Sequence, residues 1–275
     1  MRVVLQNLFG RRAGWQERRG VLVSGLRELR PDLVALPEAV VNDDYDQVPD
    51  VLGPDYHVAH QRERERGDGS DVEPGQGHSL ASRWPLGEVR ELDLHLTPRT
   101  QGFACATLAA EVLAPEPFGT VVFSFHNPSW QLEFAHEREL QAVAAARFLD
   151  QFAADRGAAH VVVAADLDAD PAAASVRFWT GRQALDGTSV CYRDAWESKH
   201  PAERGDTFGD PGNPLGVDWD WPFRRIDYIL VRCGEHGGPT LEITACERIF
   251  DHPAGGIWAS DHYGLCADLQ APEPL

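Results

Sequence analysis

The sequence predicts an α/β protein in which short apolar strands alternate with amphipathic helices. One basis is the set of apolar runs of strand length, which are spread regularly between Arg2 and Leu269 and are separated in places by segments of helical periodicity. The other basis is composition, because 43% of the 275 residues are hydrophobic, which is enough for a sizeable core. No linker forces a division of the chain, so we expect one domain over residues 1–275.

The N-terminal part has the strand–helix–strand order that is typical of neighbouring parallel strands. Residues 2–8 form an apolar run that includes Asn7 near its end, and residues 33–38 form a second run that ends at Glu38. Between them, residues 17–30 are expected to form a helix that stops at Pro31, because apolar residues share one face: Val21, Leu22, Leu26 and Leu29, with Gly25. Two such strands would place Asn7 and Glu38 at the same edge of a sheet.

Three further strands and a long helix are expected in the middle of the chain. Residues 78–83, 103–112 and 121–125 have strand patterns, and the third leads into His126 and Asn127. A histidine at a strand end can donate to a phosphate oxygen or move a proton near neutral pH, and the alternative is a purely structural hydrogen bond. The helix spans about residues 130–154, with Gly157 just past its end.

An apolar run over residues 160–165 ends in three alternate aspartates, Asp166, Asp168 and Asp170. Like charges a few ångströms apart raise one another's pKa, and a hard divalent cation with oxygen ligands relieves the repulsion. The alternative is that Asp166 turns the chain and that Asp168 is solvated. For Asp170 we favour a structural role, since Asp-Pro before an Ala-rich run to Thr180 predicts a helix with Asp170 as its N-cap.

The C-terminal third places acidic residues and a histidine at strand ends. Residues 225–231 form an apolar strand that Asp227 interrupts, and a buried carboxylate is costly unless a cation or a histidine pairs with it. Further strands are expected over residues 241–249 and 263–269, and the last of them directly follows a polar tripeptide, Ser260, Asp261 and His262. An aspartate beside a histidine at a strand entrance suits metal binding together with proton transfer.

Two long segments lack any periodic pattern and are expected to be surface loops. Residues 61–76 are polar and glycine-containing, which predicts a mobile loop. Residues 199–224 are rich in Gly, Pro and Asp and include Trp219 and Trp221, which predicts a substrate-facing loop. The two tryptophans either stack on the substrate or hold the loop in place as a small hydrophobic cluster.

Charge and cysteine usage argue against several classes of protein. Lys and Arg number 25 and Asp and Glu number 43, and the formal net charge of −18 argues against a broad, non-specific grip on nucleic acid, though not against a local basic patch. The five cysteines, an odd number without a CxxC pair, indicate neither a zinc site nor a disulfide framework. Three of them lie inside apolar strand-like runs, and we interpret these three as small buried hydrophobic residues. No signal-peptide pattern or run of membrane-spanning length is present, so we expect a cytoplasmic monomer without a transmembrane segment.

Taken in order, these polar residues resemble the motifs of the endonuclease/exonuclease/phosphatase superfamily, the metal-dependent phosphoesterases related to DNase I. Asn7 in Asn-Leu-Phe-Gly resembles the family's W-N-x-x-G, and Pro-Asp-Leu-Val-Ala-Leu-Pro-Glu38 resembles P-D-I-x-x-x-Q-E. His126 stands at the strand end that carries the family histidine. Three more matches follow along the chain: Asp166-Leu-Asp168 resembles G-D-x-N, Arg225-Ile-Asp227-Tyr resembles R-I-D-Y, and Ser260-Asp261-His262 is the S-D-H signature unchanged.

The resemblance implies a four-layer DNase I-like sandwich, in which two mixed β-sheets pack face to face and helices cover both outer faces. It also implies that Glu38 binds Mg²⁺ or Mn²⁺, with Asn7 and Asp261 assisting. By the same resemblance, Asp166 would orient or deprotonate the attacking water and Asp227 would pair with His262. His262 and His126 would contact the scissile phosphate, and the general base is either His262 or Asp166. We further predict substrate contacts for three residues, Asn127, Asp168 and Arg83.

Departures from the family motifs bear on the substrate. Asp168 stands where the family has an asparagine, and Phe9 stands where some abasic-site nucleases carry an aspartate, so we do not expect a DNA-repair role. The first hypothesis is a divalent-metal-dependent phosphoesterase that acts on a small-molecule or lipid-derived phosphate monoester or diester. A metal-dependent nuclease is the second, disfavoured by the acidic charge. The third is a catalytically silent relative that binds a metal or a polyanion, which the extra charge of Asp168 makes conceivable.

Overall fold

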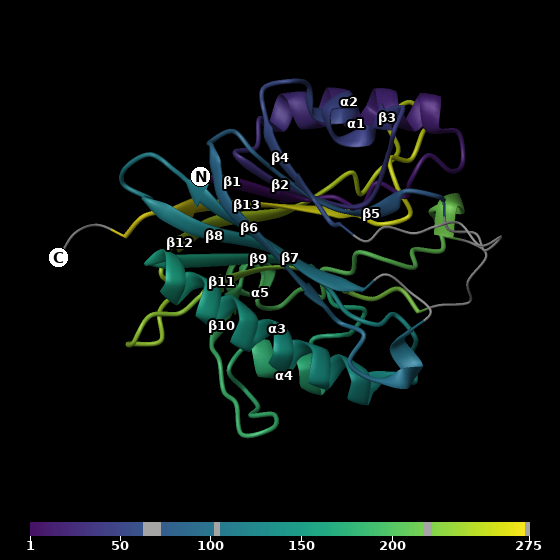
Figure 1. The fold of residues 1–275 in the computed structure, drawn as a ribbon. Helices are drawn as coiled ribbons and strands as arrows, with labels where there is room; N and C mark the ends of the chain where they lie inside the picture. The colour runs from purple at the N-terminus through teal and green to yellow at the C-terminus, as the bar shows by residue number, and fades with distance from the viewer. Residues whose placement is uncertain (63–72, 102–104, 217–221, 273–275) are drawn as a thin grey trace.

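Strand pairing divides the chain into two sheets that lie face to face (Figure 1). The computed structural model describes residues 1–62, 73–101, 105–216 and 222–272. The first sheet has the order β12 (Glu242–Ile249), β13 (Gly264–Gln270), β1 (Arg2–Leu5), β2 (Leu33–Asn42), β5 (Gln76–Ser82) and β4 (His57–His60), and the short β3 (Tyr45–Asp46) pairs with β2. The second has the order β10 (Tyr192–Asp194), β11 (Asp227–Arg232), β9 (His160–Asp166), β8 (Thr120–Asn127), β7 (Ala106–Leu113) and β6 (Leu86–Asp93).

Both sheets are mixed, as predicted. The β1–β2 and β8–β9 pairs are parallel, and a helix connects the two strands of each pair, α1 (Trp15–Leu29) in the first and α3 (Ala135–Arg156) in the second. The other pairs among the described strands are antiparallel. The predicted strand–helix–strand unit of residues 2–38 is therefore confirmed.

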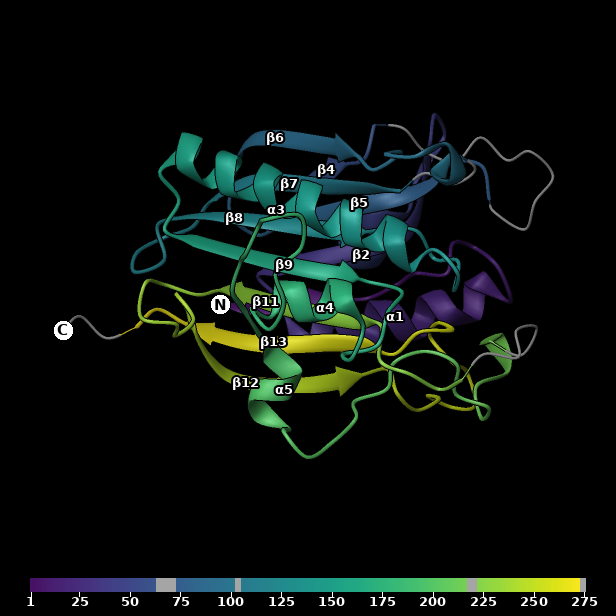
Figure 2. The same ribbon diagram turned by 90° about the horizontal axis from the view of Figure 1, so that it is seen from below.

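Helices cover both outer faces of the sandwich (Figure 1). The helices α1 and α2 (Gln47–Leu52) lie on the seven-stranded sheet, and Figure 2 shows α3 and α4 (Ala174–Trp179) lying across the six-stranded one. The short α5 (Ala195–Lys199) packs against β11 and β12, one strand from each sheet. Two 3-10 turns, Pro98–Thr100 and Pro214–Gly216, complete the described elements. None of the described helices is long and apolar enough to cross a membrane.

Three clusters of buried hydrophobic residues fill the spaces between these layers. Because successive residues of a strand point to opposite faces, Val3 lies in the central core between the sheets, whereas Val4 packs under α1. On the other sheet, Phe123 faces the central core and Val122 faces α3. Each large side chain buried in this way contributes about 1.5–3 kcal/mol. Four layers around three apolar interfaces confirm the predicted architecture.

Some elements differ from the sequence prediction. The strands β4 and β6 were not predicted, because most of their residues are at least partly exposed and polar residues interrupt the apolar pattern. The prediction of Asp170 as a helix N-cap is wrong, since α4 begins at Ala174 with Ala173 as its N-cap. The Asp170 carbonyl instead accepts from the Ala173 N–H in a preceding turn. The helix ends at Thr180 and Gly181 as expected.

The long helix α3 begins later than predicted, at Ala135 instead of about Trp130. The buried guanidinium of Arg138 donates to the carbonyls of Ser129, Gln131 and Leu132, which holds that segment in a non-helical path. The glycine stop at Gly157 is confirmed, with the left-handed backbone that glycine adopts at no steric cost. Most of the predicted loop over residues 61–76 lies outside the described residues, as do Trp219 and Trp221.

Candidate active site

The polar residues singled out in the sequence follow strand ends that meet at one rim of the sandwich. The strand β11 runs antiparallel to β9, so Asp227 at its start is paired with Asp166 at the end of β9. In the same way β13 runs antiparallel to β1, which places His262 close to the end of β1 and to Asn7. Across the central core, β1 packs against β9 and β11. The fold therefore brings two groups of polar side chains together from opposite sheets.

Strand alternation decides which of these side chains point into the rim between the sheets. In β9, Val162 and Ala164 face the central core, and Asp166 continues that face. In β11, Ile229 and Val231 face the same core, and Asp227 lies on their side. The alternation that forms the apolar core thus also directs two carboxylates into the space between the sheets.

Glu38 reaches the rim through a local irregularity of β2. The register against β5 shifts between Leu36 and Ala39, and Glu38 has a left-handed backbone with a φ of 56°. Before this bulge the odd-numbered Leu33 and Ala35 face the central core, whereas after it Ala39 packs on the helix side. A bulge reverses the side to which successive residues point, so Glu38 turns toward the space between the sheets. A non-glycine residue with positive φ costs energy, which is typical of functional positions.

Asp227 and His262 form a hydrogen-bonded pair in the centre of the rim. His262 Nδ1 lies 3.0 Å from Asp227 Oδ2, and the Thr207 hydroxyl donates to the same oxygen at 2.6 Å. Asp166, Asp227 and His262 are all buried, and they offer polar atoms that lie within 4.8 Å of one another. Because Asp227 engages Nδ1, the other ring nitrogen, Nε2, is the atom that His262 can direct to a ligand.

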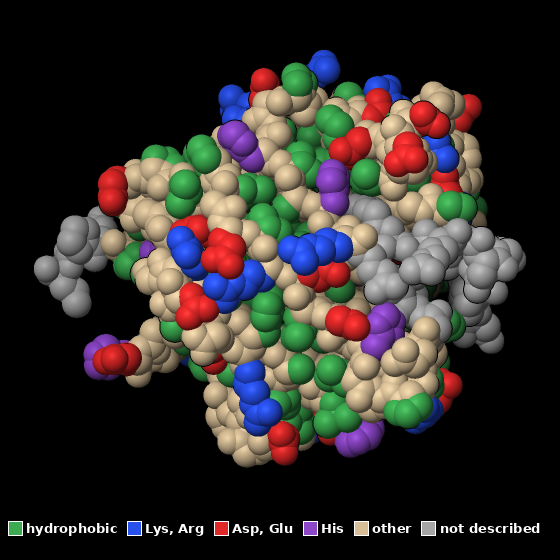
Figure 3. Space-filling view, in the orientation of Figure 1, with side chains coloured by type: hydrophobic (Ala, Val, Ile, Leu, Met, Phe, Trp, Pro, Cys, Tyr) green, Lys and Arg blue, Asp and Glu red, His purple; other side chains and the backbone are tan. Residues whose placement is uncertain are grey.

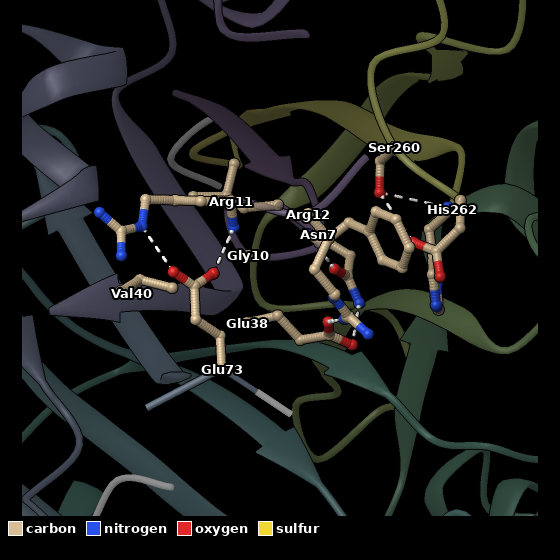
Figure 4. Close-up of polar contacts among 12 residues, drawn as sticks. Asn7, Gly10, Arg11, Arg12, Glu38, Val40, Glu73, Ser260 and His262 are labelled. Atoms are coloured by element: carbon tan, nitrogen blue, oxygen red, sulfur yellow. Dashed lines mark hydrogen bonds and ion pairs between the residues drawn. The ribbon is translucent and has the colours of Figure 1, made fainter. Parts of the chain in front are cut away.

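Glu38 is held by a neutral donor on one oxygen and by a cation on the other (Figure 4). Asn7 Nδ2 donates to Oε1 at 3.0 Å, and Arg12 Nη2 donates to Oε2 at 2.6 Å. The Asn7 carbonyl oxygen accepts from the Phe9 N–H at 2.8 Å, which fixes the orientation of the Asn7 amide. The Arg12 guanidinium also lies 4.0 Å from the centre of the Phe9 ring. Figure 4 shows Ser260 and His262 on the loop beside this group.

The rim contains several buried carboxyl groups, and burial disfavours their charged form. Burial raises the pKa of Asp166 well above its ordinary value, and the neighbouring carboxylates of Asp168 and Asp227 raise it further. Burial likewise raises the pKa of Asp168 to about 6 and that of Asp261 to about 6, and Glu38 adds to the shift at Asp261. Converging buried carboxylates of this kind are characteristic of sites that hold a cation.

His262 is the positive counterpart of these carboxylates. Burial by itself lowers the pKa of His262, but the charges of Asp227 and Asp261 and the hydrogen bond to Asp227 outweigh it, so the pKa lies well above its ordinary value. The raised pKa favours the imidazolium form, in which both ring nitrogens carry a proton. Such an imidazolium can donate to an anionic oxygen, and it has no lone pair with which to accept a proton.

Residues 5–262 match the model of the family described as "Endonuclease/Exonuclease/phosphatase family". The chain belongs to this family. Members of the endonuclease/exonuclease/phosphatase family are typically metal-dependent phosphoester hydrolases, and the sandwich described above is the fold of these phosphoesterases and nucleases. The resemblance stated from the motifs is therefore confirmed. No curated protein matches the chain in a sequence search.

Solved structures of the endonuclease/exonuclease/phosphatase family share the fold at low sequence identity. D. rerio TDP2 complexed with a single-strand DNA product superposes with a TM-score of 0.72 at 19% identity, and the match covers 98% of this chain and 99% of that one. The human Nocturnin catalytic domain with a bound sulfate anion superposes with a TM-score of 0.73 at 16% sequence identity, and the match covers 98% of this chain and 94% of that one. The endonuclease/exonuclease/phosphatase from Bacteroides vulgatus superposes with a TM-score of 0.71 at 17% sequence identity, and the match covers 98% of each chain.

The structure places most of the predicted residues at one rim. Asn127 Nδ2 donates to the backbone carbonyl of Asp166 at 3.2 Å, and the Asp168 N–H donates to Asp166 Oδ1 at 3.3 Å. Asp261 is electrostatically coupled to both His262 and Glu38, which links the two groups of side chains. The residues that meet there are Asn7, Glu38, Asn127, Asp166, Asp168, Asp227, Asp261 and His262.

Two predicted residues lie elsewhere. His126 has no exposed surface, its Nδ1 lies 2.8 Å from the Thr107 hydroxyl oxygen, and its ring packs against Trp179 under the helix layer. Burial lowers the pKa of His126 to about 3, so the ring is neutral. Arg83 follows the end of β5 that pairs with the start of β2, at the rim opposite Glu38, and it contacts Tyr56. The structure thus brings neither side chain to the rim that holds Asp166.

The alternation of side-chain direction along β8 would have been enough to predict the position of His126. In β8, Phe123 and Phe125 face the central core, so Asn127 continues that face and His126 points to the opposite side. The family motif places a histidine at this strand end, but the alternation of this sequence sends its ring to the helix layer. Asn127 is the β8 residue that contacts the Asp166 backbone.

Buried residues that the sequence analysis did not single out support the rim. The Arg18 guanidinium is buried and donates to the carbonyls of Leu8, Gly10 and Ala259, which ties the loop after Asn7 to the segment before Asp261. Arg224 donates to the Asp168 carbonyl at 3.1 Å. An arginine in a helix or a loop carries no sequence signal of such a role, because the carbonyls that it binds are brought to it by the fold.

Proposed function

We propose that this protein is a divalent-metal-dependent phosphoesterase that hydrolyses a small-molecule or lipid-derived phosphate ester by attack of an activated water. The observation that supports this most is the buried group of Asp166, Asp227 and His262, with polar atoms within 4.8 Å of one another. It combines a carboxylate able to take a proton with a charged donor for an anion, and hydrolysis of a phosphoester needs both.

Glu38, with Asn7 and Asp261, fits a hard divalent cation. The Glu38 and Asp261 carboxylates offer oxygen atoms, the ligands that Mg²⁺ and Mn²⁺ prefer, and Asn7 assists by holding Glu38 Oε1. Burial has raised the pKa of Asp261, so a cation would relieve the cost of its charge. We assign Asp227 to His262 instead of to the metal, because its Oδ2 contacts His262 Nδ1 and accepts from Thr207. We propose Glu38 as the principal ligand of Mg²⁺ or Mn²⁺. When bound, the ion supplies positive charge to the phosphoryl oxygens.

The protein's own residues account for the remaining parts of the reaction. Asp166 accepts the proton of the attacking water, since burial and neighbouring charge raise its pKa toward the range in which a carboxylate is an effective base. His262 donates from Nε2 to a phosphate oxygen and stabilises the charge that grows on it. Asp227 and Thr207 hold the His262 ring in the required orientation. We propose that Asn127 and Asp168, which flank Asp166, contact the substrate.

A nuclease is the second candidate, favoured by the similarity to a TDP2 structure that holds a single-strand DNA product. The charge distribution argues against it. The formal net charge is −18, and on the face seen in Figure 3 the described Lys and Arg side chains are scattered among Asp and Glu instead of forming a continuous patch. Proteins that bind single strands without a base-specific pocket use a basic groove with stacking aromatic residues.

A substrate panel tests the proposal. We expect bis(p-nitrophenyl) phosphate or p-nitrophenyl phosphate to be hydrolysed with Mg²⁺ or Mn²⁺, no turnover after EDTA, and recovery when the metal is added back. Labelled single-stranded DNA is the parallel substrate. Cleavage of DNA alone would favour the nuclease, and an absence of turnover on every substrate with either ion would indicate a silent relative.

Arg12 supplies a prediction about the metal itself. The Arg12 guanidinium donates to Glu38 Oε2, so a metal cation that binds Glu38 competes with Arg12 for that oxygen. We expect Arg12→Ala to bind Mn²⁺ roughly fivefold more tightly, because removal of a partly exposed ion pair is worth about 1 kcal/mol. Isothermal titration calorimetry measures the Kd. Arg11→Ala is the matched control, since Arg11 pairs with Glu73 and should leave the Kd unchanged. Weaker binding by Arg12→Ala would contradict the competition.

A further inference from the structure

Two cysteines that are distant in sequence lie in contact at the end of the six-stranded sheet. Cys191 directly precedes β10 and Cys233 directly follows β11, and their sulfur atoms are 3.2 Å apart across a separation of 42 positions. Both thiols are free and partly exposed, whereas the three other cysteines are buried. Neither Cys191 nor Cys233 belongs to any of the three hydrophobic clusters. The three cysteines of the apolar strand runs are buried, as predicted, and this pair differs from them.

Strand register places the two thiols opposite each other. The strands β10 and β11 are antiparallel, and Tyr192 is paired with Arg232, so the next residues outward are Cys191 and Cys233. The Cys233 N–H donates to the Cys191 carbonyl at 2.8 Å, which continues the ladder to this pair. Directly opposed residues of an antiparallel ladder have Cα atoms about 4.5–5.5 Å apart, within the range that a disulfide spans. The bond can therefore form without movement of the backbone.

We propose that Cys191 and Cys233 are an oxidisable pair that closes a reversible disulfide, with a low-molecular-weight disulfide such as glutathione disulfide as the oxidant. The Cys191 thiolate attacks one sulfur of glutathione disulfide, which forms a mixed disulfide and releases one glutathione thiolate. The Cys233 thiolate then attacks Cys191 Sγ and releases the second glutathione thiolate. Two protein thiols are oxidised, one glutathione disulfide is reduced to two thiols, and the protons of the two cysteines pass to the released glutathione.

The surroundings assign different roles to the two sulfur atoms. Burial and the contact with Cys191 raise the pKa of the Cys233 thiol to about 12, which disfavours Cys233 as the first attacking thiolate. Cys191 is then the attacking residue and Cys233 the resolving one. Closure should be slow near neutral pH and faster as the pH rises, because resolution needs the Cys233 thiolate.

The cross-link would join both ends of the segment that supplies one side of the rim. Thr207, Arg224 and Asp227 all lie between Cys191 and Cys233 along the chain. The bond itself would lie about 20 Å from Asp227, since six strand residues at about 3.3 Å each separate them. We therefore expect the disulfide to leave the chemistry of the rim untouched and to raise the Tm by about 5 °C, by restricting the unfolded chain. The inference does not depend on the proposed phosphoesterase activity.

Counting thiols before and after oxidation tests the pair. The full-length protein, reduced and then dialysed free of reductant, is incubated with excess glutathione disulfide, denatured, alkylated and weighed by intact mass spectrometry. We expect five alkylated thiols to fall to three, and a tryptic cross-link between the peptides that contain Cys191 and Cys233. Five alkylated thiols after oxidation, or a cross-link that involves one of the three other cysteines, would overturn the proposal.

Single variants keep the test independent of folding and separate the two roles. Cys233→Ser should trap one glutathione on Cys191 under the same conditions, whereas Cys191→Ser should trap far less. Cys246→Ser is the matched control, because Cys246 is buried, and it should lose one thiol from the count yet still form the cross-link. Equal trapping in the two single variants would overturn the assigned order of attack, and a cross-link lost in Cys246→Ser alone would overturn the pair.

Discussion

Asp166→Asn is expected to lower kcat for phosphoester hydrolysis by about 10²- to 10⁴-fold, the range that a general base contributes. The substituted amide keeps the shape of the side chain but cannot take a proton from water. Because burial and two neighbouring carboxylates raise the pKa of Asp166, its charge is unfavourable in the fold, and the variant should be at least as stable as the wild type. Steady-state kinetics with a chromogenic phosphodiester and thermal unfolding measure the two effects.

Asp170→Asn is the matched control for this variant. Asp170 is exposed and lies four positions along the same loop, so its loss changes the charge near the rim without touching Asp166. We expect its kcat to stay within about twofold of wild type, since surface substitutions have small effects. Turnover by Asp166→Asn at the wild-type rate would remove Asp166 from the mechanism.

Asp194→Ala is expected to lower the free energy of unfolding by about 3–5 kcal/mol, the cost of leaving one buried charge without its partner. The Asp194 carboxylate forms an ion pair with Arg225, and both side chains are at most 5% exposed. Its second oxygen accepts from the Glu197 N–H as the N-cap of α5, so the helix loses its cap as well. Denaturant unfolding followed by circular dichroism measures the loss.

An exposed ion pair of the same residue types provides the comparison. Arg147 pairs with Asp186 at 3.2 Å, but both side chains are more than half exposed, so Asp186→Ala should cost less than about 1 kcal/mol. The double variant Asp194→Leu with Arg225→Met should recover much of the loss, because it removes both buried charges together. Equal destabilisation by Asp194→Ala and Asp186→Ala would show that burial of the Arg225 pair does not determine its energy.

The position of Arg225 connects this pair to the site. Arg225 precedes Asp227 by two residues, and the pair with Asp194 anchors the start of β11 to the neighbouring β10. The strand that carries Asp227 is thereby fixed at its entrance to the rim. Asp194→Ala should for that reason lower activity more than its loss of stability alone explains, which a comparison of kcat at a temperature where both proteins are folded can show.

Much of the fold could be predicted because local patterns determine it. Alternation in β8, β9 and β11 follows from the need to bury one face of each strand, and it also directs Asp166 and Asp227 into the rim. The order of the six motifs along the chain was sufficient to indicate the family, which the match over residues 5–262 confirms. The weakly patterned β4 and β6 were missed because half-exposed strands bury too little apolar surface to show a period.

The sequence by itself determined the family, the layered architecture and the acidic residues that lie at the ends of strands. Only the tertiary structure decided that a bulge turns Glu38 into the rim and that Arg12 binds the Glu38 oxygen for which a cation would compete. It alone brought Cys191 beside Cys233. The physical reason is that hydrophobic periodicity is a local property of the chain, whereas a polar side chain takes its role from whichever distant groups the packed core sets beside it.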